Sequence, residues 1–169
     1  MKNVFILTGP PASGKNTIAM QLAPHLSRCA VIDVDLVRWM VIHPHKAPWD
    51  GEEGKRQQVL GVENTCLLTQ SFLEANLSVL ILDVLSSETA MLYKTSLAAS
   101  APQIILLLPT IEEIIRRNRV RSRLTNEEIS MLYEQNRHFT LYDEKIDNTA
   151  VSAEQVVEWF LARYPEGGR

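Results

Sequence analysis

Cysteine is scarce in this chain, long apolar runs and a large excess of charge are missing from it, and each of these features excludes a class of protein. The only cysteines, Cys29 and Cys66, form no metal-ligand pattern, so we expect buried free thiols in a reducing compartment. No apolar run approaches a membrane span, since the run at 79–85 is interrupted by Asp83. The net charge of −3 gives no overall attraction to nucleic acid. No signal peptide precedes the first apolar run, and a cytoplasmic protein is expected.

The order of apolar and helical segments predicts an α/β fold. With 169 residues, 46% of them hydrophobic, the chain has the size of one domain, residues 1–169, with a sizeable core. Segments of helical character separate the short apolar runs, and this alternation favours a mostly parallel five-stranded sheet with helices on both faces. Ligands of such sheets gather beyond the carboxyl ends of the strands. The predicted strands are Val4–Leu7, Ala30–Ile32, Val79–Leu82, Ile104–Leu108 and Lys145–Ile146.

A glycine-bearing segment, GPPASGKNT, follows the first predicted strand and precedes a predicted helix at 18–26. In this context the spacing of Gly9, Gly14 and Lys15 is typical of a phosphate-binding loop, or P-loop. The glycines allow backbone angles that let N–H groups converge on phosphate oxygens, and Lys15 adds a cation. The hydroxyl expected after the lysine is replaced by Asn16 and comes one place later, at Thr17. The predicted nucleotide-binding residues here are Gly9, Pro10, Pro11, Ala12, Ser13, Gly14, Lys15, Asn16 and Thr17.

Two carboxylates, Asp33 and Asp35, follow the second predicted strand, and Arg38 comes one helical turn after Asp35. A carboxylate at this place can orient an acceptor hydroxyl and take its proton during phosphoryl transfer. We predict Asp35 as the base and Arg38 as a ligand of an anionic or polar part of the acceptor, although Asp33 is an alternative base. Each aspartate has a structural alternative as a helix cap.

Further candidates lie in two other segments. Residues 43–51 contain two prolines and a glycine and are predicted to form a loop, in which His43 and Trp49 are candidate acceptor ligands or plain surface residues. Asp83 ends the third predicted strand, where a carboxylate suits a Mg²⁺ partner acting through water, together with Thr17; it can also touch the acceptor or play a purely structural role. A metal site at His43 and His45 lacks a third ligand.

Five arginines crowd residues 116–123 after the fourth predicted strand. Phosphoryl transfer needs cations around the migrating group, and guanidinium forks suit its oxygens. Arg117 and Arg121 share one helical face and are the predicted catalytic pair. A nucleic-acid patch is the alternative, but the segment lacks interleaved aromatic residues.

The lysine–variable–threonine order at 15–17 resembles that of adenylate kinases and related nucleoside monophosphate kinases. Together with Asp-x-x-Arg at 35–38, it resembles a group of small P-loop kinases that includes chloramphenicol phosphotransferase, polynucleotide 5′-hydroxyl kinases, gluconate and shikimate kinases and zeta toxins. The resemblance implies a three-layer P-loop NTPase fold and an arginine-rich lid at about 116–126, which includes Arg117 and Arg121. It also implies that the loop after the last strand, with Asp147, Asn148 and Thr149, wraps the adenine.

Taken together, these features predict an ATP-dependent kinase that uses Mg²⁺ and phosphorylates a hydroxyl of a small-molecule acceptor. A nucleic-acid 5′-hydroxyl kinase and a nucleotide-binding regulatory module without transfer activity are the alternatives. The acidic balance speaks against the first, and the arginine segment and Asp35 speak against the second. We expect a monomer or a homodimer, with neither membrane nor nucleic acid as partner. The sequence does not identify the acceptor.

Overall fold

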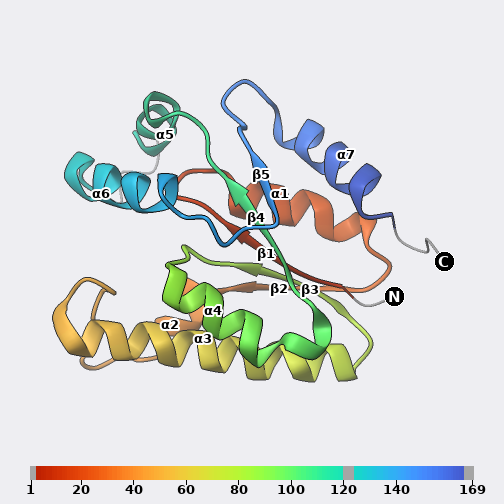
Figure 1. Ribbon diagram of the computed structural model, residues 1–169, viewed down its shortest axis with the longest axis horizontal. Coiled ribbons are helices and arrows are strands. Elements are labelled where there is room, and N and C mark those ends of the chain that lie inside the picture. The colour runs from red at the N-terminus through yellow and green to blue at the C-terminus, as the bar shows by residue number, and fades with distance from the viewer. Residues whose placement is uncertain (1–2, 120–123, 166–169) are drawn as a thin grey trace.

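A computed structural model describes residues 3–119 and 124–165 and contains a five-stranded parallel sheet in the order β2-β3-β1-β4-β5 (Figure 1). Every pairing is parallel, as the alternation of short apolar runs predicted. The apolar runs become strands because both of their faces are covered; every residue of β1 and β3 is buried. The strands are β1 Val4–Thr8, β2 Cys29–Asp33, β3 Ser78–Leu82, β4 Gln103–Leu107 and β5 Glu144–Ile146.

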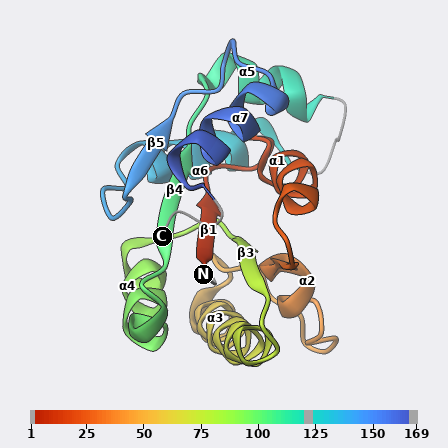
Figure 2. The same cartoon turned by 90° about the vertical axis from the view of Figure 1, so that its right-hand side faces the viewer.

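Helices cover the sheet on both faces, which makes the predicted three layers (Figure 2). One core packs α1 and α7 against the sheet around Phe5 and Phe160. The core on the opposite face joins α2, α3 and α4 to the sheet through Val34, Val62 and Tyr93. The helices are α1 Lys15–Leu22, α2 Val34–Arg38, α3 Gly51–Glu74, α4 Ser87–Ser96, α5 Ile111–Asn118, α6 Asn126–Arg137 and α7 Ala153–Arg163.

The local sequence explains where two of the helices begin or end. Helix α1 begins at Lys15 and gives way at Ala23 to a 3₁₀ turn, because Pro24 cannot continue the α-helical hydrogen bonds. The three- and four-residue spacing of apolar side chains predicts a helix over 57–75. In the structure α3 begins earlier, at Gly51, where acidic side chains in the first turn suit the positive end of the helix dipole. This earlier start brings the first turns of α3 up against the loop that follows α2.

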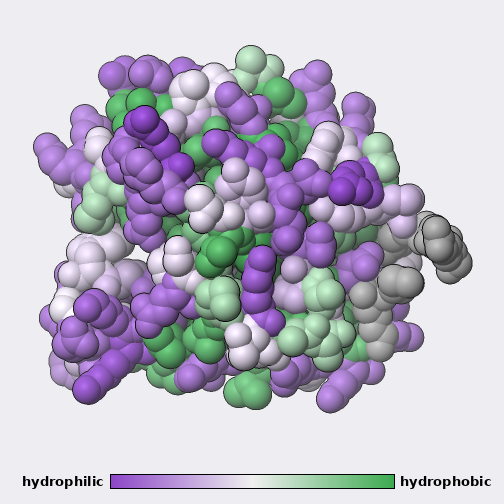
Figure 3. Space-filling view, in the orientation of Figure 1, coloured by the Kyte–Doolittle hydropathy of each residue, from purple (hydrophilic) through white to green (hydrophobic). Residues whose placement is uncertain are grey.

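Polar caps set the starts of several helices. Thr110, Thr125 and Ser152 each accept a hydrogen bond from a backbone N–H of the helix that follows, a role for which Thr and Ser are favoured at this position. Within the described ranges, no helix combines the length and the apolar character needed to cross a bilayer. The face shown in Figure 3 is predominantly hydrophilic, with smaller hydrophobic areas between the polar side chains.

Candidate functional site

The predicted phosphate-binding loop lies between β1 and α1, at the carboxyl end of β1. Three residues have positive φ: Gly9 at 145°, Ala12 at 64° and Gly14 at 101°. A Cβ at Gly9 would lie 2.2 Å from the carbonyl oxygen of Leu107 in β4, so no other residue fits there. The left-handed Ala12 was not predicted, because an alanine in the sequence carries no signal for positive φ.

Lys15 lies across the loop, and its side chain is buried. Its Nζ donates hydrogen bonds to the carbonyl oxygens of Gly9 (2.7 Å) and Pro10 (3.1 Å). The ammonium group is thereby held over the loop at the start of α1, where the helix dipole also favours an anion. Inside the loop, the hydroxyl of Ser13 is buried and has no hydrogen-bond partner among the described residues.

Arg117 and Asn148 clamp the loop from two other elements. Arg117 Nη1 (3.3 Å) and Asn148 Nδ2 (2.8 Å) both donate to the carbonyl oxygen of Ser13, and Arg117 Nη2 donates to the backbone oxygen of Asn148 (2.8 Å). Arg117 Nε donates to Glu113 (2.6 Å). The structure therefore brings Arg117 and Asn148 to the loop, but it uses all three guanidinium nitrogens for protein contacts. Arg117 is positioned here to brace the loop.

Glu113 orients the arginines of α5. Its hydrogen bonds with Arg116 and Arg117 hold the pKa of its carboxyl at about 2, well below the ordinary value. Arg116 is exposed, whereas Arg117 is three-quarters buried. The predicted lid at 116–126 is described only in part, since Arg121 lies in 120–123, outside the described residues. Asn118 is buried and donates to the carbonyl oxygen of Leu124, so this contact joins the two described sides of the segment.

The loop after β5 lies next to the clamp. Asn148 is buried, while the side chains of Asp147 and Thr149 are hydrogen-bonded to each other (2.6 Å). This bond lowers the pKa of Asp147. Thr149 Oγ1 also accepts a hydrogen bond from the backbone N–H of Thr110 (2.8 Å), which fixes the loop to the start of α5. Of the three predicted adenine-side residues, only Asn148 contacts the phosphate-binding loop through its side chain.

Asp33 and Asp35 have distinct roles at the end of β2. Asp33 caps α2 by accepting from the backbone N–H of Asp35, and its other oxygen accepts from Asn16 Nδ2 (3.0 Å). The asparagine that replaces the usual hydroxyl thus ties the phosphate-binding segment to β2. Asp35 has 71% of its side chain exposed. The capping alternative therefore holds for Asp33, and the carboxylate of Asp35 is the one that is open to solvent.

Arg38 lies beside Asp35, as the helical spacing predicted. Arg38 Nη1 lies 3.3 Å from Asp35 Oδ1, and Arg38 Nη2 donates at 3.3 Å to the carbonyl oxygen of Lys46. Only 12% of the Arg38 side chain is exposed, and its Nε has no hydrogen-bond partner among the described residues. Arg38 is therefore a largely buried cation next to an exposed carboxylate.

Asp83 follows β3 and lies within the electrostatic reach of this pair. Burial raises the pKa of its carboxyl to about 6, against hydrogen bonds from the backbone of Val84 and from the hydroxyl of Tyr93 (3.1 Å). Asp35 adds to the increase and Arg38 opposes it. Among the described residues, the hydrogen bonds of the Asp83 side chain are those from the backbone of Val84 and from Tyr93. Tyr93 was not singled out from the sequence, since a tyrosine inside a helix gives no signal of its partner.

The segment between α2 and α3 forms the outer wall beside Asp35. His43 is exposed and Trp49 is 44% exposed, so both are accessible. Trp39 stacks on the ring of His45 with 3.8 Å between ring centroids and remains 59% exposed. This aromatic pair was not predicted, because nothing in the local sequence shows that the rings of Trp39 and His45 meet.

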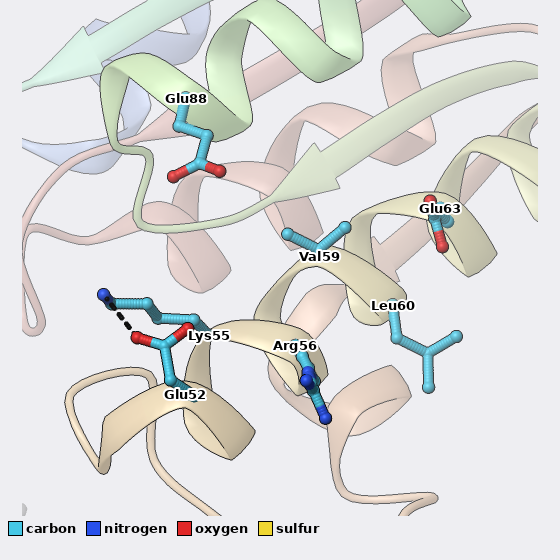
Figure 4. A pocket seen from close by; sticks show the side chains of 7 residues that line it. All are labelled: Glu52, Lys55, Arg56, Val59, Leu60, Glu63 and Glu88. Carbon is cyan, nitrogen blue, oxygen red and sulfur yellow. Dashed lines mark hydrogen bonds and ion pairs between the residues drawn. The ribbon is translucent and has the colours of Figure 1, made fainter.

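A shallow hollow of about 320 Å³ lies beside this wall, at the first turns of α3 and α4 (Figure 4). Charged side chains from both helices face it, and Lys55 forms an ion pair with Glu52 at its rim. Neither the phosphate-binding loop nor Asp35 lines it, so its shape says nothing of the nucleotide. The lining residues are Glu52, Lys55, Arg56, Val59, Leu60, Glu63 and Glu88.

No oxygen-rich metal cluster marks the site within the described residues, where no three His, Cys, Asp or Glu side chains converge. Thr17 is exposed on the first turn of α1, and both oxygens of Asp83 already accept hydrogen bonds. Such side chains suit Mg²⁺ held mainly by phosphate oxygens and water, which is the usual arrangement for this ion at nucleotides. Cys66 is buried, and burial raises the pKa of its thiol to about 11, so it is an inert structural thiol; Cys29 is partly buried.

Solved structures with the same fold support the architecture. No family model matches the chain, and no curated protein matches it in sequence. The structure is similar to the tunicamycin resistance protein of Deinococcus radiodurans (TM-score 0.71, 15% identity, 96% of this chain and 95% of that one). It is also similar to shikimate kinase from Acinetobacter baumannii (TM-score 0.65, 16% identity, 96% of this chain and 93% of that one). A sugar kinase from Janibacter sp. is a third similar structure (TM-score 0.66, 18% identity, 96% of this chain and 94% of that one). The chain therefore shares its fold with these three proteins, two of which are named as kinases.

Proposed function

We propose that this protein transfers the γ-phosphoryl group of MgATP to a hydroxyl group of a small-molecule acceptor. The observation that carries the proposal is the Asn16–Asp33 hydrogen bond (3.0 Å), which joins the phosphate-binding segment to the strand end that presents Asp35. A loop for phosphates and a carboxylate for a hydroxyl thus share one edge of the sheet. The kinase names of the structural neighbours agree with this assignment.

The nucleotide half uses backbone and cation chemistry. The backbone N–H groups between Gly9 and Lys15 bind phosphate oxygens at the start of α1, and Lys15 neutralises charge on the outer phosphates. Arg117 and Asn148 hold the loop through the carbonyl oxygen of Ser13. Mg²⁺, when bound with the nucleotide, offsets charge on the phosphates; Thr17 and Asp83 are the residues suited to hold its water shell.

The acceptor half supplies the base. The acceptor oxygen forms a bond to the γ-phosphorus as the bond from that phosphorus to the bridging oxygen breaks, and ADP leaves. Asp35 accepts the hydroxyl proton, for which its exposed carboxylate is available. Arg38 presents a largely buried guanidinium to an anionic or polar part of the acceptor. Most of the rate enhancement then comes from positioning and electrostatics.

A transfer assay with γ-labelled ATP tests the proposal and searches for the acceptor. The candidate acceptors are sugars, nucleosides, aminoglycosides, chloramphenicol-like compounds and 5′-hydroxyl oligonucleotides. We expect label to move to a small hydroxyl compound in the presence of Mg²⁺. Label on oligonucleotides alone would identify a nucleic-acid kinase. Slow release of phosphate that no acceptor accelerates would identify a regulatory nucleotide-binding module.

A further inference from the structure

Helix α3 touches the acceptor wall, defined as residues 34–50, at three successive positions. Gly54, Gln57 and Gly61 are spaced three and four residues apart and therefore share one face of the helix. Gly54, Gln57 and Gly61 are all buried. Figures 1 and 2 both show α2 lying against α3. This face of α3, called the seat below, contacts the wall from Arg38 to Ala47.

The Gln57 side chain forms hydrogen bonds with backbone groups of the wall that lie outside any strand or helix. Its Oε1 accepts a hydrogen bond from the backbone N–H of Lys46 (2.9 Å), and its Nε2 donates to the carbonyl oxygen of Pro44 (2.6 Å). A second donation from Nε2 to Glu53 (3.0 Å) fixes the amide within α3. One buried side chain thus determines where two backbone groups of the wall lie.

The two glycines let the wall lie directly on the helix. A Cβ at Gly54 would be 2.0 Å from the carbonyl oxygen of Ala47, and a Cβ at Gly61 would be 2.5 Å from Arg38 Cγ. Glycine weakens a helix interior relative to alanine, so its presence at both contact points indicates that the close approach matters more than helix propensity. Gly61 in particular leaves room for the stem of Arg38.

We propose that the seat holds the acceptor wall in its binding geometry before any acceptor arrives, with Gln57 and Gly61 as positioning residues. Gln57 sets the position of Lys46, whose carbonyl oxygen receives Arg38 Nη2. Gly61 supports the same arginine from below. Gln57, through Lys46, and Gly61 therefore both determine where Arg38 lies. Arg38 in turn is paired with Asp35. The link to catalysis rests on the proposed function, whereas the preformed wall does not.

Hydrogen exchange at the Lys46 amide tests the preformed wall directly. In Gln57→Ala, this amide is expected to exchange about tenfold faster or more, because its acceptor is gone, while the amides of β1 and β3 keep their rates. Gln58→Ala is the matched control: Gln58 is the next residue of α3, and its side chain makes no hydrogen bond within residues 3–119 and 124–165. An unchanged Lys46 amide in Gln57→Ala would overturn the proposal.

Gly61→Ala provides a second variant that favours the helix and displaces Arg38. With an acceptor from the transfer assay, we expect the KM for acceptor to rise about tenfold and the KM for ATP to stay unchanged. In an Arg38→Ala background, Gly61→Ala should have no further effect, because the displaced side chain is absent. An equal effect in both backgrounds would refute the role of Gly61. If no acceptor is found, the proposed function fails, and the Lys46 exchange result still decides whether the seat exists.

Discussion

The nucleotide half and the acceptor half of the site differ in how their backbones are held. In the nucleotide half, Ser13 in the middle of the loop receives two side-chain hydrogen bonds from α5 and from the segment after β5. In the acceptor half, the wall receives its support from α3, and apolar side chains such as Met40 and Ile42 are more than 70% exposed. The nucleotide is common to all kinases, whereas the acceptor is particular to each. A loop held from two other elements suits a ligand that all kinases share. A wall supported by a single helix suits a ligand that differs between kinases.

The largest expected effect comes from removing the cation of the nucleotide half. Lys15→Ala should lower the transfer rate by about a thousandfold and weaken ATP binding, because the outer phosphates lose their charge partner. Transfer kinetics and nucleotide titration measure the two effects. Lys145→Ala on β5, whose side chain is exposed, is the control and should behave as wild type. Transfer by Lys15→Ala at the wild-type rate would place the phosphates elsewhere.

The next largest effect separates the two halves. Asp35→Asn should lose transfer by at least about a hundredfold while ATP affinity stays unchanged, because only the hydroxyl proton loses its acceptor. Asp33→Asn keeps a side chain able to cap α2 and to bond Asn16, so its transfer rate should fall far less. Wild-type activity in Asp35→Asn, or the reverse order of the two variants, would refute the assignment of the base.

Arginines 116 and 117 offer a matched pair within the nucleotide half. Arg117→Ala should weaken ATP binding about tenfold, because Ser13 and Asn148 lose a shared brace. Arg116→Ala removes an exposed side chain that pairs with the same Glu113 and should change affinity little. Nucleotide titration of both variants measures the difference. Equal losses would mean that Glu113, and not the loop contact, is the important partner.

The smallest expected effect concerns Asp83 and stability. Its pKa of about 6 lies above the ordinary 3.8, so the folded state binds the proton more tightly than the unfolded state. The ionised carboxyl therefore costs stability above about pH 6, and that cost disappears as the pH falls from about 6 to 4. Asp83→Asn should remove this dependence, as denaturant unfolding at several pH values would show. An identical pH profile in the variant would contradict the shifted pKa.

The sequence predicted the nucleotide half better than the acceptor half. Gly9, Gly14 and Lys15 carry a motif whose geometry is local, so residues close in the chain suffice to predict it. In a parallel sheet the carboxyl ends of the strands lie at one edge, so the sequence predicts that Asp33 and the loop after β1 face the same crevice. It does not predict the particular hydrogen bond between Asn16 and Asp33. Asp33 and Asp35 were both candidates, and only the direction of each side chain showed which one is a cap.

The unpredicted residues act through contacts between distant segments. Gln57 bonds Lys46 and Pro44, and nothing in its local sequence reveals these contacts. Gly54 and Gly61 reveal their role only once the wall lies on α3. Tyr93 likewise needs the packing of α4 to reach Asp83. Such contacts join residues that are far apart in the chain, so one sequence alone does not predict them.

The central claim is that the loop between β1 and α1 binds MgATP. Calorimetric titration of the wild-type protein with MgATP tests it most directly. We predict saturable binding at one site that is weakened in Lys15→Ala and keeps its affinity in Asp35→Asn. A wild-type protein that gives no heat at millimolar MgATP, and whose thermal unfolding is the same with and without the nucleotide, would contradict the account.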